Sequence, residues 1–328
     1  MRPQGRKLLA IDRQVWSGGG QNLMNNVRLA ERLFPSYFSG SGTPLALSNV
    51  VGKSVLRQGG FIYLPQNAWA WNGPTVGARE AFRRSVIRAG SIAAEHRSLL
   101  SIRIGPMIPE LLNARSQVLA NVLDAEFEGA LERGSNERKM SWIPDSRYWL
   151  VPGSLWSYRN VEPVIEAFKT AREFDPELCV LFVGPLPRES GLQKEVLRGG
   201  FDSGVSFFTE RVERHQMLRA IESAEVCILS SLVEASPVTM LEAAALGTRI
   251  AAWDNAAYRF LAQDANVPDV DFFANVDELL TAVLAPRLHR RSVLVQESVR
   301  TAVRNTWVEN FLSLCCDDLA GTEKVRST

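Results

Sequence analysis

Hydrophobic and polar positions follow two patterns along this chain. Uninterrupted apolar runs predict buried strands, and apolar residues three and four positions apart predict helices between them. In the first half the pattern begins with a strand-like run at 8–11, a helical stretch at 22–33 and a second strand at 61–64. From residue 148 the alternation is regular, with strands expected at 148–151, 178–183, 205–208, 226–229 and 249–253. Strands alternating with helices predict parallel sheets covered on both faces, an α/β fold.

The same pattern suggests where the chain divides. Helices are expected at 80–94 and 116–133, followed by a polar linker at 134–139 and a change of composition near residue 145. With 328 residues and 46% hydrophobic content, the chain can bury two cores. We therefore expect one domain over residues 1–145 and a second over 146–304.

Composition narrows the function classes. Lysine plus arginine number 37 and aspartate plus glutamate 36, so no overall field favours a nucleic acid, and no nucleic-acid partner is expected. The four cysteines lack a metal-ligand spacing and indicate reduced thiols in a cytoplasmic protein. No apolar run approaches the length that spans a bilayer, and the apolar stretch at 8–11 is too short for a signal peptide. Peripheral contact with the inner face of a membrane remains open.

The strongest chemical signal is the segment 234–242, Glu-Ala-Ser-Pro-Val-Thr-Met-Leu-Glu. It follows the buried strand 226–229. Ser236 is a good N-cap, and Pro237 fits the first helical position because that residue needs no N–H there. The first N–H groups of the helix, at Val238 and Thr239, lack intrahelical partners and suit a phosphate.

Two carboxylates flank this helix start. Glu242 lies within the helix, where side chains lean back toward the N-terminus, and its carboxylate could accept hydrogen bonds from a ribose diol. Glu234 precedes the helix and could meet a second hydroxylated group. Gly153 and Gly184 each follow a predicted strand, so they should converge with Glu234 on one crevice. The alternative reading is a capped helix with two solvated glutamates.

Three stretches of the second half resemble retaining glycosyltransferase family 4, the group 1 glycosyltransferases. They are residues 150–160, residues 181–184 and residues 230–243, of which the last carries the family's two-glutamate motif. The likeness covers about residues 148–255 well and the first half loosely. It implies an α/β GT-B fold, with two Rossmann-like domains facing a central cleft. It also implies that a C-terminal helix, over 305–328, packs back on the first domain.

The resemblance assigns roles to residues. Glu242 would hold the donor's ribose, Glu234 would contact the transferred sugar, and the amides after Ser236 would take the diphosphate. Arg159 matches the family's basic residue and would neutralise the leaving diphosphate. The glycines that would let the backbone approach the donor and acceptor, unless they are only a flexible turn, are Gly18, Gly19 and Gly20.

Some positions depart from the family pattern. Ser154 stands where the family usually has an arginine, and the histidine expected beside the transferred sugar is replaced by Gln66 or Asn67. Arg211 could reach the nucleotide. The arginines at 79–88 are expected on a solvated face, although an anionic lipid or acceptor could use them. Residues 269–271, Asp-Val-Asp, are expected in a surface loop and not at a metal site.

These observations predict a retaining, metal-independent glycosyltransferase without a cofactor. Its donor would be a nucleotide sugar such as a UDP-sugar or GDP-sugar. Its acceptor would be the hydroxyl of a glycan, glycolipid or small molecule, in cell-surface polysaccharide or glycoconjugate synthesis. Two alternatives remain: a non-catalytic GT-B relative that binds a nucleotide sugar or glycan without turnover, and a sugar-nucleotide epimerase or hydrolase on the same fold.

Overall fold

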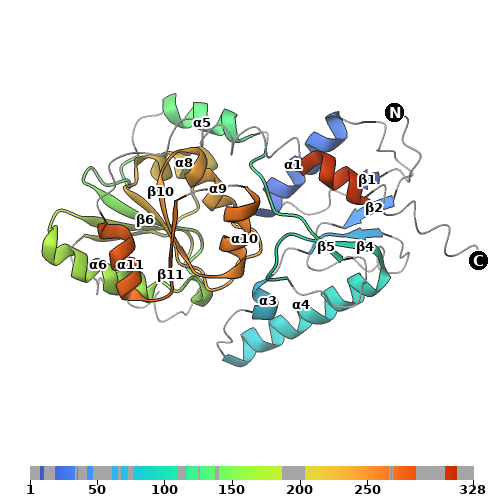
Figure 1. Ribbon diagram of the computed structural model, residues 1–328, viewed down its shortest axis with the longest axis horizontal. Coiled ribbons are helices and arrows are strands. Elements are labelled where there is room, and N and C mark those ends of the chain that lie inside the picture. The colour runs from blue at the N-terminus through green and yellow to red at the C-terminus, as the bar shows by residue number, and fades with distance from the viewer. Residues whose placement is uncertain are drawn as a thin grey trace, which may run out of the picture. The chain divides into compact units, whose positions relative to one another are not determined.

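The computed structural model groups the chain into two compact units (Figure 1). Unit 1 comprises Met1–Ala125, Val233–Val238 and Thr301–Thr328, and unit 2 comprises Glu126–Leu232 and Thr239–Arg300. Residues 126–145 thus fall in unit 2, whereas the sequence suggested a boundary at 145. The structure describes residues 8–10, 19–33, 35, 43–46, 61–65, 68–72, 77–108, 116–124, 126–136, 140–186, 204–265, 267, 269–285 and 307–315.

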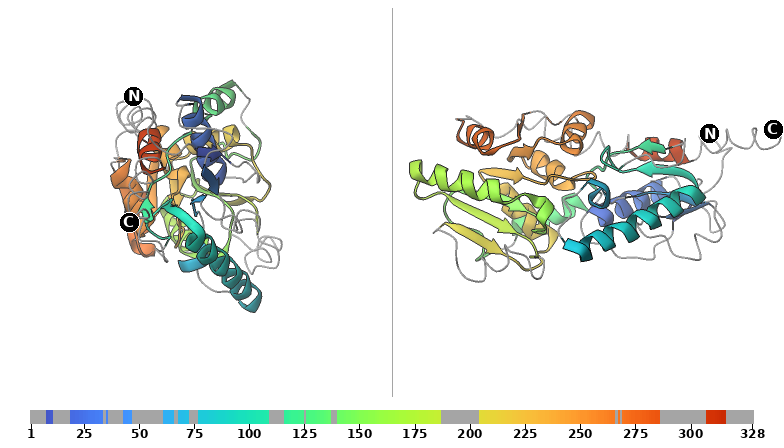
Figure 2. Two further views of the ribbon diagram at one scale, coloured as in Figure 1. Left: turned by 90° about the vertical axis from the view of Figure 1, so that its right-hand side faces the viewer. Right: turned by 90° about the horizontal axis from the view of Figure 1, so that it is seen from below.

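The described strands of unit 1 form a parallel five-stranded sheet in the order β1-β2-β3-β4-β5. The strands are β1 (Leu8–Ala10), β2 (Thr43–Ala46), β3 (Phe61–Tyr63), β4 (Ser98–Arg103) and β5 (Ser116–Val118). The helices are α1 (Gly19–Leu33), α3 (Trp69–Asn72) and α4 (Gly77–Arg97). Helix α4 runs beside β3 and β4 (Figure 2). Ile62, Leu100 and Ile102 are fully buried at the centre of the sheet.

The prediction of a helix over 116–133 was wrong. Residues 116–118 form β5, residues 119–124 are buried without regular structure, and a helix begins only at α5 (Phe127–Asn136) in unit 2. Apolar side chains at 119–123 imitated a helical stripe, but they are all buried, whereas a surface helix buries one face.

The glycine-rich turn expected at residues 17–20 also needs correction. Gly19 and Gly20 are the first two residues of α1, because the helix starts earlier than the apolar periodicity suggested. Gly18, Gln66 and Asn67 lie outside the described residues.

Unit 2 contains a doubly wound parallel sheet in the order β11-β10-β9-β6-β7-β8. The strands are β6 (Tyr148–Pro152), β7 (Cys179–Val183), β8 (Val205–Phe208), β9 (Val226–Leu229), β10 (Arg249–Trp253) and β11 (Val270–Phe273). The chain builds the sheet outward from β6 on one side, then returns to place β9 on the other, with Leu150 opposite Cys227. The carboxyl ends of β6 and β9 are therefore the topological switch point, where ligands bind in such sheets.

Helices cover both faces of this sheet. They are η2 (Ser157–Arg159), α6 (Glu162–Phe174), α8 (Arg214–Ser223), α9 (Val238–Ala245), α10 (Ala256–Asp264) and α11 (Val276–Leu284). Helices α6 and α11 lie side by side (Figure 1), and Phe168 and Leu279 pack with Trp149 in one core. On the other face the Tyr148 hydroxyl donates to the Ala220 carbonyl of α8 at 2.7 Å. Double-sided burial explains why the strands read as continuous apolar runs.

Strand β11 corrects the expected loop at 269–271. Asp271 lies in β11, and its Oδ2 is 3.3 Å from Nε of Arg249 on β10. The polar Asp271 interrupts the apolar run of this four-residue edge strand and hid its signal.

Residues 307–315 form a helix that the contacts group with unit 1. The Trp307 indole N–H donates to the Ala120 carbonyl at 2.8 Å. The rest of the expected C-terminal helix, residues 316–328, lies outside the described residues. Across the part of the chain that the structure describes, no helix has both the length and the apolar character for a membrane crossing.

Candidate functional site

The switch point of unit 2 brings two glycine turns together. Gly153 follows β6, and its N–H donates to the Val183 carbonyl at 2.8 Å; Gly184 follows β7, and its N–H donates to the Phe208 carbonyl at 2.9 Å. Both have positive φ, 108° and 148°. A Cβ on Gly184 would lie 2.3 Å from the Gly153 carbonyl oxygen, so only glycine fits. The expected convergence of Gly153 and Gly184 is thus present in the structure.

Arg159 is fixed beside these turns. Its Nη1 donates to the Ser231 hydroxyl at 2.7 Å, and the Ser230 hydroxyl donates to its carbonyl. A Cβ on Gly153 would come within 3.2 Å of the Arg159 guanidinium carbon. The glycine therefore makes room for the cation, and the two serines after β9 hold it at the switch point.

Asn255 secures the loop that carries Ser231. Its side-chain N–H donates to the Ser231 carbonyl at 2.9 Å, while its Oδ1 accepts from the N–H groups of Ala257 and Tyr258 at 2.9 and 3.0 Å. One side chain thus caps α10 and ties that cap to the Arg159 anchor. Sequence reasoning missed Asn255, although an asparagine directly before a helix is an ordinary capping signal.

Glu242 is buried on α9, with 7% of its surface exposed. Nε of Arg214 donates to Glu242 Oε1 at 3.0 Å, and Nη2 of the same guanidinium lies 3.0 Å from that oxygen. Burial, with a smaller contribution from the Glu242 charge, raises the pKa of the Cys227 thiol on β9 well above its ordinary value. Arg214 was not anticipated, because its partner lies 28 positions away.

The loop before α9 belongs to unit 1. The Ser236 hydroxyl accepts a 2.8 Å hydrogen bond from the Asn121 N–H, and the Ser236 carbonyl accepts from the Asn121 side chain at 3.3 Å. A Cβ on Gly105 would lie 1.7 Å from the Ala235 carbonyl oxygen. Asn121 and Gly105 thus fit the loop closely, and neither was expected from the sequence. Glu234 in this loop is half-buried.

The helix start differs from its prediction by one residue. Helix α9 begins at Val238, followed by Thr239, so the buried Pro237 precedes the helix. Ser236 is tied to Asn121, which satisfies its hydroxyl by a tertiary contact that local capping rules do not foresee. At the other end Gly247 adopts a left-handed φ of 73°, as expected of a helix terminator.

The remaining candidates are Arg211 and the arginines of α4. Arg211 is exposed just before α8. Arg84 and Arg88 on α4 both donate to the Trp71 carbonyl, at 3.3 and 3.1 Å, so this part of the expected solvated face is engaged in packing. Within the described ranges, no group of three or more His, Cys, Asp or Glu side chains is arranged to hold a metal ion.

Residues 146–285 match the family model described as glycosyl transferases group 1. Over these residues the chain is similar to the group 1 glycosyl transferases. The match spans the switch point, Arg159, Arg214 and Glu242. No curated protein sequence matches the chain.

Solved structures extend the likeness over most of the chain. A trehalose-phosphate synthase from Burkholderia xenovorans, in complex with glucose-6-phosphate, aligns with a TM-score of 0.57 at 11% identity, covering 91% of this chain and 77% of that one. An E. coli trehalose-6-phosphate protein bound with UDP-2-fluoro glucose aligns with a TM-score of 0.55 at 10% identity, covering 89% of this chain and 76% of that one. WaaG, a glycosyltransferase of lipopolysaccharide biosynthesis, aligns with a TM-score of 0.50 at 16% identity, covering 91% of this chain and 79% of that one. The chain thus has a GT-B fold like that of these structures.

Proposed function

We propose that the protein transfers a sugar from a nucleoside-diphosphate sugar to an acceptor hydroxyl, with retention of configuration and without a metal ion or cofactor. The acceptor is a glycan, glycolipid or small molecule. The observation that carries the proposal is the guanidinium of Arg159, held by Ser231 at the switch point beside Gly153. Support comes from the group 1 match and from two similar structures, one bound with UDP-2-fluoro glucose and one with glucose-6-phosphate.

Arg159 suits the leaving group. Breaking the bond between the sugar C1 and the phosphate oxygen builds negative charge on the departing diphosphate. A cation already fixed where that charge develops stabilises the transition state without reorganising. Gly153 leaves the guanidinium accessible from the turn, because any Cβ there would crowd it.

The other residues each contact a different part of the donor. Glu242 accepts hydrogen bonds from the ribose hydroxyls, and the first N–H groups of α9, at Val238 and Thr239, face the diphosphate. Glu234 contacts the transferred sugar. The acceptor oxygen attacks C1 from the side of the departing phosphate. Its electron pair forms the new C–O bond, the old bonding pair leaves with the diphosphate, and the acceptor proton moves to the departing phosphate oxygen.

The test is a panel of uridine, guanosine, adenosine and thymidine diphosphates and their sugars, with and without EDTA. Binding to the native state raises its melting temperature. We expect one base to give a shift that EDTA does not alter and that Glu242→Ala abolishes. Glu225→Ala, which removes a carboxylate at the opposite edge of the sheet, should keep the shift. No shift with any nucleotide would overturn the proposal.

A second function is favoured by Ser154. This serine stands where the family resemblance led us to expect an arginine, so the diphosphate loses one expected cation. A non-catalytic relative would bind the nucleotide sugar yet release neither free sugar nor a glycosylated product. Turnover of the nucleotide sugar, measured as release of the nucleoside diphosphate in the presence of candidate acceptors, distinguishes the transferase from the non-catalytic relative.

A further inference from the structure

Arg214 is held in place by contacts on three sides, all within unit 2. It is the first residue of α8, where a capping box joins the side chains of Glu213 and Gln216 to backbone N–H groups. Its guanidinium carbon lies 6.0 Å from the ring centroid of Phe127, which is fully buried on α5. Its third contact is the Glu242 carboxylate.

The packing of α5 on α8 explains why Phe127 lies there. Gly134 on α5 meets the backbone of α8 so closely that a Cβ would lie 2.9 Å from the His215 carbonyl oxygen. The two helices therefore approach each other at Gly134. The residue that Gly134 meets is His215, which directly follows Arg214 on α8. Residues 127–136, which the sequence assigned to the other domain, thus help to fix an arginine beside the two-glutamate motif.

The pair meets at one oxygen of the carboxylate. Nε of Arg214 donates to Oε1 of Glu242 at 3.0 Å, and Nη2 lies 3.0 Å from the same oxygen. An ionised carboxylate has about four lone-pair sites on its two oxygens, so a contact to one oxygen does not by itself exclude further hydrogen bonds. A buried carboxylate without a cation would be costly, and the arginine supplies the opposite charge and limits the rotation of the carboxylate.

We propose that Arg214 is the positioning residue that orients Glu242 toward the ribose hydroxyls of the donor. This inference rests on the proposed function, since it needs Glu242 to meet a ribose. It assigns the arginine no contact with the reacting atoms. Removing it should weaken the binding of nucleotides that have a ribose diol and spare those that lack it.

The opposite role would be a latch, in which Arg214 occupies Glu242 and competes with the ribose. The two roles differ in sign. A positioning residue improves ribonucleotide binding, so its loss raises the dissociation constant. A latch reduces binding, so its loss lowers that constant.

The experiment measures dissociation constants by calorimetry for uridine, guanosine and adenosine diphosphates and for their 2′-deoxy counterparts. The proteins are wild type, Arg214→Met, Arg214→Lys, Glu242→Gln and the double variant Arg214→Met/Glu242→Gln. We expect Arg214→Met to weaken the ribonucleotide about tenfold, as for one charge-assisted hydrogen bond, and the 2′-deoxynucleotide much less. Arg214→Lys keeps the charge and should recover part of the loss. In the double variant, the arginine substitution should add nothing to Glu242→Gln.

Arg219→Met is the matched control, because Arg219 lies on the same helix and pairs only locally with Glu222 at 2.8 Å. It should bind both nucleotides as wild type does. Circular dichroism and urea unfolding show whether each variant folds, and Arg214→Lys is the variant to use if Arg214→Met does not.

The outcomes separate this inference from the proposed function. If wild type binds none of the nucleotides, the proposed function fails. If wild type binds and Glu242→Gln loses binding while both Arg214 variants bind normally, the positioning role alone is overturned. Equal losses for ribo- and deoxynucleotide would also overturn it, and tighter binding by Arg214→Met would establish a latch.

Discussion

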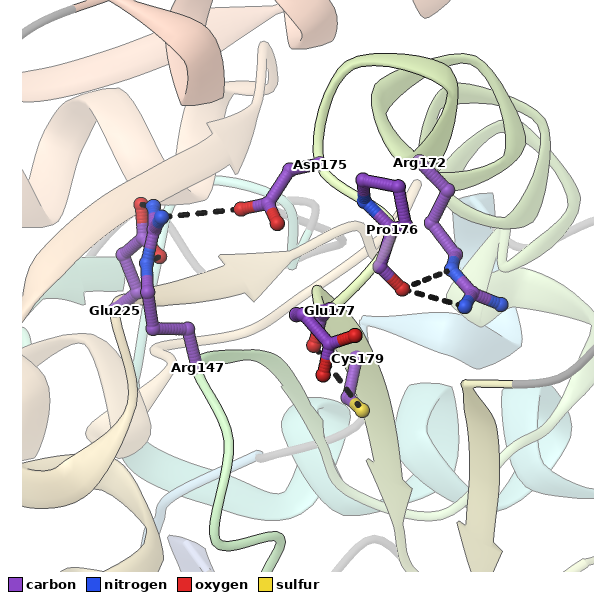
Figure 3. A network of polar contacts seen from close by, with 7 residues as sticks. All are labelled: Arg147, Arg172, Asp175, Pro176, Glu177, Cys179 and Glu225. Carbon is purple, nitrogen blue, oxygen red and sulfur yellow. Dashed lines mark hydrogen bonds and ion pairs between the residues drawn. The ribbon is translucent and has the colours of Figure 1, made fainter.

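The two edges of the sheet in unit 2 use arginine in different ways. At the amino edge, Arg147 precedes β6 and forms a two-pronged pair with Glu225, at 2.9 and 2.8 Å, and a 3.0 Å pair with Asp175 (Figure 3). Its side chain is 67% exposed. At the carboxyl edge, Arg214 and Glu242 are 28% and 10% exposed. The better hydrogen-bond geometry thus belongs to the pair that faces water.

The difference shows why ion pairs alone do not mark a site. Glu225, through its hydrogen bonds and then its charge, raises the pKa of Arg147, yet solvent screens such a pair and it contributes little to stability. In the same network, Arg172 donates to the Pro176 carbonyl at 2.6 Å, and the Cys179 thiol donates to the Glu177 carbonyl at 3.9 Å (Figure 3). The Arg214–Glu242 pair at the carboxyl edge is more buried, so its charges cost more to remove from water. In return, the pair fixes the position of the Glu242 side chain. The following predictions test that contrast.

The largest expected effect comes from exchanging an arginine at each edge for methionine. Arg159→Met should lower the transfer rate about 10²–10³-fold, since it removes a fixed donor to the developing charge. Arg147→Met should leave the rate unchanged. Steady-state kinetics measure both, and equal losses in the two variants would erase the functional distinction between the edges.

A second contrast uses backbone strain at the carboxyl edge. Gly184→Ala should lower the free energy of unfolding by about 1–3 kcal/mol or more, because it forces a Cβ into a left-handed conformation against the Gly153 carbonyl. Gly129→Ala on α5 has room, with its nearest neighbour at 3.8 Å, and should stabilise the protein by about 0.5 kcal/mol. Urea unfolding gives both values. A neutral Gly184→Ala would contradict the close packing of the two turns.

A third contrast compares two helix-capping asparagines, of which only one also contacts the loop that holds Arg159. Asn255 caps α10 and also donates to the Ser231 carbonyl, whereas Asn275 caps α11 by accepting from the Glu278 N–H at 2.9 Å. Either asparagine changed to alanine should cost about 1 kcal/mol of stability. Only Asn255→Ala should also slow transfer, because Ser231 holds Arg159. Unfolding and kinetics on the same preparations decide this, and a normal rate in Asn255→Ala would break the link.

The smallest effect concerns the buried Cys227 thiol and alkaline pH. Because the pKa of Cys227 is raised in the folded protein, the thiol stays protonated above pH 9.0 while the unfolded chain loses that proton. The unfolded state then binds fewer protons, so stability falls as pH rises from about 9, by at most about 1.4 kcal/mol per pH unit. Cys227→Ala should reduce this loss, measured by urea midpoints at pH 8 and pH 9.8, and an unchanged loss would contradict the raised pKa.

Much of unit 2 was readable from the chain. The bounds expected for β8, β9 and β10 agree with the structure, because strands buried on both faces leave continuous apolar runs. Gly153 and Gly184 were placed together by the rule that parallel strands end at one edge. The edge strand β11 was missed because its Asp271 is polar. The stretch 119–124 was misread because burial without secondary structure mimics a helical pattern.

What the sequence determined by itself is the α/β alternation, the likeness to group 1 glycosyltransferases, and the elements that carry Arg159 after β6 and Glu242 after β9. These features depend on local periodicity and on chemistry at short spacing. Tertiary structure alone decided that Ser231 and Asn255 fix Arg159, that Arg214 meets Glu242, and that residues 127–136 pack beneath that pair. The hydrogen bonds among these contacts join positions 24 to 72 residues apart, and only the folded sheet sets those distances.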